Sequence, residues 1–384
     1  MDAVSVTAAP GFLAAAVGAG IKPSGALDLA VVIAEGKAVP AAGVFTRNRA
    51  AAAPVALSRR RLQQGRARAV VLNSGSANAG TGLQGVADAE RITGRVAELV
   101  ADDPDHILMC STGPIGSRLP VEQMMEALPG LVRSAGTGGG SAASEAILTT
   151  DSRAKTTVVR GEGFVVGGMA KGSGMLRPDM ATMLCVLTTD AAVDSVILSR
   201  VLSEATPVTF NSLNVDGCES TNDTVFLLAS GIGAAVAADE LGQAVESACR
   251  HLAYEMAADA EGASRVVQLR LSGAPDDQVA RHFGRAVADS ALVRSSFYGG
   301  DPNWGRILAA LGACQVDPSD VSISYEGVSV ADQGLACSFD DRNLAELLTG
   351  DFIIDISVGV GCGRAEIVTT DLTPEYVRFN GERS

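Results

Sequence analysis

Histidine is scarce in this sequence: only His106, His251 and His282 occur among its 384 residues. No two of them have the spacing of zinc ligands, and none lies in a glycine-rich loop or a recognisable catalytic motif. A Ser-His-Asp catalytic triad would therefore require one of these histidines to lie beside a serine and an aspartate in the fold, and no local pattern indicates this. If the chain is an enzyme, we expect its general base to be another group, and we expect no metal site.

Aromatic residues are also few, and the cysteines do not occur in closely spaced pairs. Aromatic residues make up 4% of the chain, so a large core must be built from Ala, Val, Leu and Ile, with 43 Gly allowing tight turns. The seven cysteines include no C-x-x-C pair, and an odd number argues against a full disulfide framework. We expect the cysteines to be buried small apolar residues.

The chain also lacks an excess of positive charge and has no long apolar run. The sequence has 30 Lys and Arg against 44 Asp and Glu, and its formal net charge of −14 repels phosphate backbones and anionic membrane surfaces. No apolar run approaches the roughly 20 residues of a membrane span, and the first residues lack the basic start of a signal peptide. We expect no nucleic acid partner, no membrane association and a cytoplasmic location.

Short apolar runs and helical patterns are mixed along the whole chain. The expected strands are residues 27–34, 42–46, 67–72, 265–271, 321–325 and 352–358. The expected helices are residues 85–100, 119–132, 195–205 and 239–260. This order is neither a regular strand and helix alternation nor all β, so it predicts α+β layers. No long linker divides the chain into independent domains.

The most unusual segment is residues 170–190, where Lys171-Gly-Ser-Gly is followed by Ala181-Thr182. The tetrad does not match a nucleotide-binding P-loop, because the spaced glycine required before the lysine is missing. Local composition alone is also explained by a glycine turn that leads into a buried strand from 182 to 188.

The run from Lys171 to Leu184 resembles the signature of the ornithine acetyltransferase (glutamate N-acetyltransferase) family of arginine biosynthesis. Members of this family cleave themselves at the bond that corresponds to Ala181-Thr182. The resemblance covers nearly the whole chain and includes Gly43-Val-Phe-Thr-Arg-Asn, Asn73-Ser-Gly-Ser-Ala-Asn, Ser111-Thr-Gly-Pro, Thr149-Thr-Asp, Thr221-Asn-Asp-Thr, Asp259-Ala-Glu-Gly-Ala and Asp301-Pro-Asn-Trp-Gly-Arg.

Elementary chemistry supports a threonine nucleophile in a chain with few histidines. A threonine hydroxyl needs a base, and an N-terminal threonine supplies its own base as the free α-amine. An α-amine has an unperturbed pKa of about 7.7 to 8.0, close to the pH at which a general base works best. Cleavage before Thr182 would create this amine.

The resemblance implies a two-step acetyl transfer. Thr182 would take the acetyl group from N2-acetyl-L-ornithine, and L-glutamate would then attack the acetyl-enzyme. Thr112 and Gly113 would form the oxyanion hole. The substrate-binding residues implied by matching position are Thr149, Lys171, Thr182, Glu261, Asn380 and Ser384. No cofactor is implied, although acetyl-CoA is a second acetyl donor for some family members.

The resemblance also implies a fold and an assembly. The fold is a layered αββα-type sandwich of the ornithine acetyltransferase and DmpA-like type, with mixed sheets and two such halves. Residues 1–181 would form an α chain and residues 182–384 a β chain, and the two would interleave in one catalytic unit. Two copies of each chain would assemble as a heterotetramer.

Three alternatives stay open at this point. A paralogue from secondary metabolism would move an acyl group to a different amino acid. An N-terminal-nucleophile amidase would use water in place of glutamate, and would release ornithine whether or not glutamate is present. A catalytically silent binding protein on the same scaffold would stay uncut.

Overall fold

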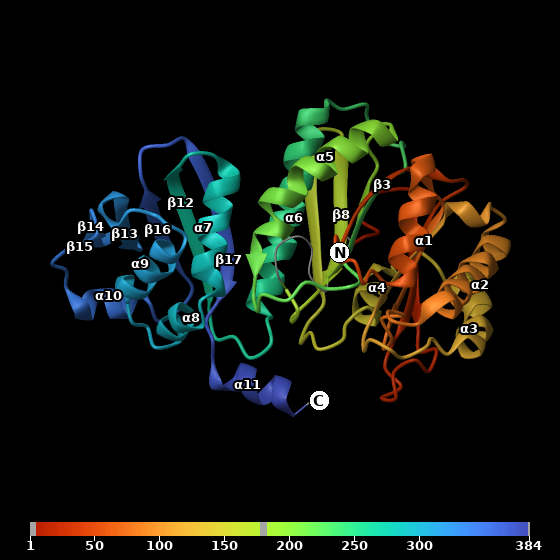
Figure 1. The fold of residues 1–384 in the computed structure, drawn as a ribbon. Coiled ribbons are helices and arrows are strands. Elements are labelled where there is room, and N and C mark those ends of the chain that lie inside the picture. The colour runs from red at the N-terminus through yellow and green to blue at the C-terminus, as the bar shows by residue number, and fades with distance from the viewer. Residues whose placement is uncertain (1–4, 177–182, 383–384) are drawn as a thin grey trace. The chain divides into compact units, whose positions relative to one another are not determined.

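The computed structural model describes residues 5–176 and 183–382, which form two compact units (Figure 1). Unit 1 draws its described residues from Met1–Phe210 and Cys218–Met256, and unit 2 from Asn211–Gly217 and Ala257–Ser384. The chain passes between the units through short connections, so neither length nor composition marks the boundary.

Unit 1 contains two mixed sheets. The four-stranded sheet has the order β1-β2-β5-β6, with bounds Phe12–Val17, Leu29–Ala34, Ala69–Ser74 and Ile107–Thr112. The six-stranded sheet has the order β4-β3-β11-β9-β8-β7, with bounds Arg66–Ala67, Val39–Phe45, Thr224–Ala229, Leu184–Thr189, Phe164–Lys171 and Lys155–Gly161. The pairs β5 with β6 and β9 with β11 are parallel, and the other pairs of these two sheets are antiparallel.

The two sheets of unit 1 pack face to face. One apolar core joins Val32 and Leu72 of the first sheet to Val186 and Phe226 of the second. β9 is buried along its whole length, so its first four residues, Leu-Cys-Val-Leu, are apolar without alternation.

Helices cover the outer faces of both sheets (Figure 1). The helices over the four-stranded sheet are α1 (Ala53–Arg61), α2 (Gly82–Val100) and α3 (Val121–Arg133). The helices over the six-stranded sheet are α5 (Ser195–Val208) and α6 (Ala238–Ala258). A short helix, α4 (Gly140–Ala146), packs beside β1. These layers confirm the expected αββα sandwich with mixed sheets.

Unit 2 is built on one seven-stranded sheet of the order β10-β17-β12-β16-β13-β14-β15. The strands are Leu213–Asn214, Gly363–Thr370, Val266–Ala274, Phe352–Val358, Val321–Tyr325, Val328–Asp332 and Leu335–Ala336. The helices are α7 (Asp277–Asp289), α8 (Ala291–Tyr298), α9 (Trp304–Ala313), α10 (Asp341–Leu347) and α11 (Pro374–Gly381).

One face of this sheet is apolar and the other is polar. Leu269 and Ile354 lie on the apolar face and share a core with Ile307 of α9. Arg270 and Asp355 pair on the opposite face and are exposed. The expectation of two αββα halves therefore holds for unit 1 alone, since unit 2 has two layers.

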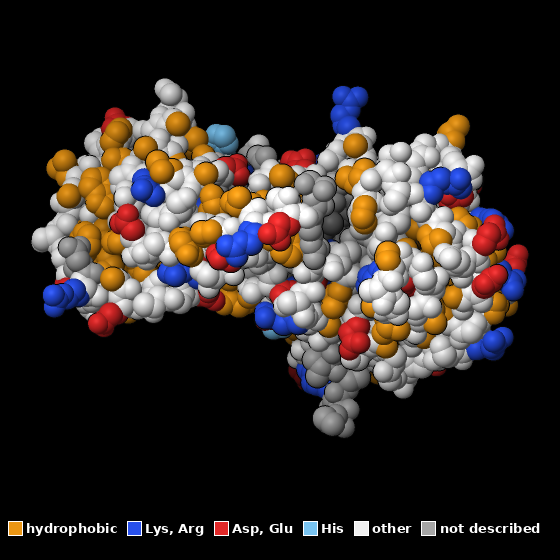
Figure 2. All heavy atoms as spheres, turned by 90° about the horizontal axis from the view of Figure 1, so that it is seen from below, with side chains coloured by type: hydrophobic (Ala, Val, Ile, Leu, Met, Phe, Trp, Pro, Cys, Tyr) orange, Lys and Arg blue, Asp and Glu red, His pale blue; other side chains and the backbone are white. Residues whose placement is uncertain are grey.

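The surface and the cysteines complete this description. No helix in the described part of the chain is long and apolar enough to span a membrane. Acidic and basic side chains are interspersed on the face that Figure 2 shows. Cys110, Cys185 and Cys249 are buried as expected, whereas Cys218 and Cys362 are exposed, and none of the seven cysteines, all of which lie within the described residues, forms a disulfide.

Candidate active site

The described residues nearest in sequence to the predicted nucleophile, Thr182, lie in β8 and β9 or directly beside them. Ala181, Thr182 and Ser384 lie outside the described residues. Lys171, the last residue of β8, pairs in register with Leu184, the first residue of β9. The strand that follows Thr182 therefore begins beside Lys171.

The predicted oxyanion hole is a rigid turn at the end of β6. Thr112 is buried, and its carbonyl accepts a hydrogen bond from the Gly75 amide at 2.9 Å. Gly113 has a φ of +138°, and a Cβ at this position would lie 2.5 Å from the Ser76 nitrogen. Only glycine fits there, because both the backbone angle and the space exclude a side chain. The turn thus has the fixed geometry that an oxyanion hole requires.

Lys171 joins two of the predicted site hydroxyls. Its buried Nζ donates to Thr149 Oγ1 at 2.8 Å and to Thr112 Oγ1 at 3.5 Å. Because an ammonium group can only donate, both hydroxyls act as acceptors here and keep their own hydrogens for another partner. Thr149 is exposed, so the cluster of Thr112, Thr149 and Lys171 reaches solvent on that side.

Asp151 is the counter-ion of this cluster, and no sequence pattern indicated a role for it. Its Oδ1 accepts from Lys155 Nζ at 2.7 Å and from the Gly172 amide at 2.7 Å, and its Oδ2 lies 3.5 Å from Lys171 Nζ. Burial alone would raise the pKa of the Asp151 carboxyl, but the charges of Lys171 and Lys155 outweigh it and hold this pKa well below the usual range. One carboxylate against two ammonium groups leaves a local positive charge that favours an anionic ligand.

Two residues of the Thr221-Asn-Asp-Thr motif also contribute to the site. The Asn222 side-chain amide donates to Ala77 O at 2.7 Å and to Ser111 O at 2.8 Å, so it joins the loop after β5 to the end of β6. Asp223 Oδ1 accepts from the Met183 amide at 3.0 Å. The resemblance includes this motif, but the only local signal that its polar residues are buried is the apolar run of residues 225–229 that follows them.

Glu261 and Asn380 belong to unit 2. Glu261 is half-buried just after α6, and the next residue, Gly262, packs against the backbone of Tyr376 in α11. Asn380 lies one turn further along α11, where its side chain donates to Tyr376 O at 3.1 Å. The structure thus brings these two predicted residues to one region of unit 2, whereas the Lys171 cluster belongs to unit 1.

The histidines have other surroundings. His106 Nδ1 lies 2.7 Å from Asp102 Oδ1, just before β6, whereas Thr112 is at the opposite end of that strand. His251 lies exposed on α6, and His282 lies on α7 in unit 2. Within residues 5–176 and 183–382, no group of three or more His, Cys, Asp and Glu side chains is arranged to hold a metal ion.

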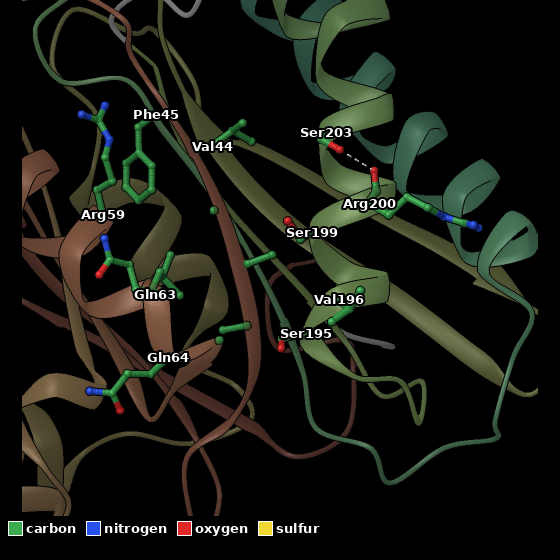
Figure 3. A pocket seen from close by; sticks show the side chains of 15 residues that line it. Val44, Phe45, Arg59, Gln63, Gln64, Ser195, Val196, Ser199, Arg200 and Ser203 are labelled. Carbon is green, nitrogen blue, oxygen red and sulfur yellow. Dashed lines mark hydrogen bonds between the residues drawn. The ribbon is translucent and has the colours of Figure 1, made fainter.

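A separate groove of about 800 Å³ lies between α1, β3 and α5 (Figure 3). Ser195, Ser199 and Ser203 line one wall, and Arg59 and Gln63 line the other. The described residues of the Lys171 cluster are not part of its lining. The groove is therefore distinct from the candidate active site.

The family model and the similar proteins all indicate the same family. The model of the ArgJ family matches residues 13–384. The "Arginine biosynthesis bifunctional protein ArgJ" of Thermobifida fusca is 44% identical over 99% of this chain and 100% of its own length. The protein of the same name from Mycobacterium tuberculosis is also 44% identical, over 100% of this chain and 97% of its own length.

A solved structure is similar to part of the chain. The ornithine acetyltransferase of Mycobacterium tuberculosis in complex with ornithine is 44% identical, covers 48% of this chain and 98% of its own, and has a TM-score of 0.45. The family match and the full-length relatives decide the assignment. This chain belongs to the ArgJ family.

Proposed function

We propose that this chain is an acetyltransferase of arginine biosynthesis, which moves the acetyl group from N2-acetyl-L-ornithine to L-glutamate through an acetyl-Thr182 intermediate. The observation that carries this proposal is the meeting of Thr112, Thr149 and Lys171 beside the strand that follows Thr182. The resemblance implies a role in the site for all three residues, which lie far apart in the sequence. The names of the relatives from Thermobifida and Mycobacterium support the same pathway.

Maturation begins with attack of the Thr182 hydroxyl on the Ala181 carbonyl carbon. The bond between that carbon and the Thr182 nitrogen breaks, and an ester to the Thr182 oxygen replaces it. Water then opens the ester and leaves fragments 1–181 and 182–384, the second with a free α-amine.

Turnover uses this amine as the base. It takes the proton of the Thr182 hydroxyl as the oxygen attacks the acetyl carbonyl, and gives it to the departing nitrogen of ornithine. The Thr112 hydroxyl and the Gly113 amide stabilise the oxyanion. The glutamate amine attacks the acetyl-enzyme in the second step, which reverses these proton transfers. Lys171 attracts the substrate carboxylate, and Glu261, Asn380 and Ser384 remain predicted substrate contacts.

The proposal also includes a second acetyl donor, a subunit assembly and a location in the cell. The relatives are named as bifunctional, which supports acetyl-CoA as an additional acetyl donor to glutamate. Two α and two β chains form the proposed heterotetramer, and the proposed location is the cytoplasm. Water or another amino acid as acceptor is the alternative function.

Intact-mass measurement tests the maturation. We expect two fragments, one that starts at Met1 or Asp2 and one that starts at Thr182. The Thr182→Ala variant should stay uncut and inactive, because it lacks the hydroxyl that attacks. Thr137→Ala removes an exposed hydroxyl and is the matched control that should be cut normally. A wild-type chain that stays at 39.1 kDa would sink the proposal.

Steady-state assays test the acceptor. Ornithine release from N2-acetyl-L-ornithine should require glutamate and should yield N-acetylglutamate in equal amount. Release at the same rate without glutamate would identify an amidase. Replacement of acetylornithine by acetyl-CoA then shows whether the second donor is used.

A further inference from the structure

The groove between α1, β3 and α5 contains an open edge of the six-stranded sheet (Figure 3). Strand β4 pairs with β3 only at Val39 and Pro40, whereas the groove is lined by the next five residues of β3, 41–45. On the other side of β3, strand β11 pairs with residues 41–45. In the described part of the chain, this stretch of β3 therefore has a neighbouring strand on one side only.

The backbone of β3 directs alternate amide and carbonyl groups into the groove. In an antiparallel pair, one residue bonds to the partner strand and the next residue points its N–H and C=O groups to the opposite side. The Ala41 amide is of the second kind, because it donates to Gly65 O at 3.0 Å. Gly43 and Phe45 have the same phase, so their N–H and C=O groups also point away from β11. Both residues are half-buried, and within residues 5–176 and 183–382 these groups have no hydrogen-bond partner.

An added strand would meet a different wall on each of its two faces, because side chains alternate between the faces of a strand. One wall is apolar: Leu62 covers Gly43, where a Cβ would lie 2.6 Å from Leu62 Cδ1. The other wall is polar and consists of Ser195, Ser199 and Ser203, which follow one another at helical spacing on α5 (Figure 3). The groove therefore suits a segment in which apolar and hydroxyl side chains alternate.

Arg59 gives the groove a positive charge near Phe45. Its guanidinium carbon lies 5.4 Å from the centre of the Phe45 ring, and its Nη2 donates to Thr46 O at 2.8 Å. No carboxylate of the described residues pairs with Arg59, and none of the described residues that line the groove is Asp or Glu. Arg200, the other arginine of the lining, already pairs with Asp239 at 3.0 Å. In a chain with a net charge of −14, this groove therefore favours a carboxylate ligand.

The spacing of the open backbone groups indicates the shape of the ligand. Gly43 and Phe45 are two residues apart in a strand, so their groups lie about 7 Å from each other. An extended peptide repeats its own N–H and C=O groups at the same interval and can bind both residues. A small carboxylate compound has no such repeat.

We infer that the groove binds an acidic, extended segment of a partner protein, which joins the edge of β3 as an additional strand and places a carboxylate beside Arg59. Main-chain hydrogen bonds to Gly43 and Phe45 supply the affinity, and the two different walls supply the specificity. The inference concerns a second site of the protein and does not rest on the proposed acetyl transfer.

The first test measures binding of a peptide, fluorescein-Ser-Val-Ser-Val-Ser-Glu-NH2, to the whole protein by fluorescence anisotropy. Two further peptides carry N-methyl groups, one on both valines and the other on the second and third serines. Because only alternate amides of an added strand face β3, one methylated peptide should bind about 30-fold more weakly, and the other should bind like the parent. Equal effects of the two methylation patterns, or no saturable binding of the parent peptide, would overturn the inference.

A pair of arginine variants tests the carboxylate contact. Arg59→Gln should weaken binding of the parent peptide about 10-fold, because it removes a charged hydrogen-bond donor. Arg200→Gln is the matched control, since Arg200 also lines the groove and is exposed, but its side chain points away from β3 (Figure 3). It should bind like wild type. Wild-type affinity in Arg59→Gln would rule out an acidic partner.

Hydrogen exchange examines the open edge without any variant. In the free protein, the amides of Gly43 and Phe45 should exchange faster than those of Ala42 and Val44, whose phase directs them to β11. Saturating peptide should slow exchange at Gly43 and Phe45, and unchanged exchange at both would contradict strand addition. A dimer of the protein that the peptide dissociates would identify a second copy as the occupant, and would also overturn the inference.

Discussion

At the scale of single residues, the ammonium group of Lys171 determines how two neighbouring hydroxyls are used. It donates to both Thr112 and Thr149, so each hydroxyl hydrogen can turn toward a substrate oxygen. Asp151 Oδ2 lies 3.5 Å from this ammonium group, and Lys155 binds the other oxygen of the same carboxylate at 2.7 Å. The charge therefore orients the donors as well as attracting an anion.

This arrangement predicts different effects for the two threonines. Thr112→Val removes a buried donor to the oxyanion, so kcat should fall about 100-fold with little change in the KM for N2-acetyl-L-ornithine. Thr149→Val is the matched control, because Thr149 is exposed and is a predicted substrate contact. It should raise KM with a much smaller effect on kcat. Steady-state ornithine release measures both, and an unchanged kcat in Thr112→Val would remove this residue from the oxyanion hole.

The sequence predicted some of these residues and missed others for a physical reason. Thr112, Thr149 and Lys171 were predicted because they lie in motifs that resemble those of a family. Asp151 and Asp223 lie in two of the same motifs, but their importance depends on partners in other segments. Asp223 contacts Met183, 40 positions earlier in the chain, and no pattern within a short window reports such a contact.

At the scale of elements, prediction succeeded where an apolar stripe has a clear period. The helix expected at 85–100 is α2, whose buried residues Ala89, Ile92 and Val96 follow helical spacing. Helix α1 was missed, because it ends in three consecutive arginines and has no apolar stripe. The strand expected at 42–46 begins at Val39 in the structure, since Pro40 sits at the edge position where its missing amide hydrogen is tolerated.

Two glycines of α2 should respond to alanine in opposite directions. Nothing lies within 4 Å of a Cβ built on Gly94, so Gly94→Ala should increase stability by about 1 kcal/mol through helix propensity. A Cβ on Gly85 would lie 1.9 Å from Thr81 Oγ1, so Gly85→Ala should decrease stability by about 1 to 3 kcal/mol. Urea unfolding in the Thr182→Ala background measures both changes in an uncut chain. Equal effects of the two substitutions would contradict the packing around Gly85.

At the scale of the whole molecule, the proposed cleavage site falls inside unit 1 and not between the units. Strands β9 and β11 follow Thr182 in the sequence, and β3 and β8 precede it. In the six-stranded sheet, β9 and β11 lie side by side between β3 and β8. The division into two units was not predictable, because the boundary near residues 211–217 carries no linker composition.

This strand order predicts that the two fragments stay together after cleavage. Separation would break the pairing of β8 with β9 and of β3 with β11, and would expose the core between the two sheets. Gel filtration in native buffer should therefore give one peak that contains both fragments, and only denaturant should separate them. Two native peaks would contradict the proposed interleaving of residues 1–181 and 182–384.

The central position of β9 also sets the order of events in the life of the chain. A strand with neighbours on both sides cannot easily be added to a sheet that has already closed, so the sheet has to form while the chain is still continuous. Cleavage would then occur only in chains whose sheet has formed, and it would not be reversed. Chains that misfold before this point would stay intact, and the ratio of cut to uncut protein in a cell would report how many molecules have folded correctly.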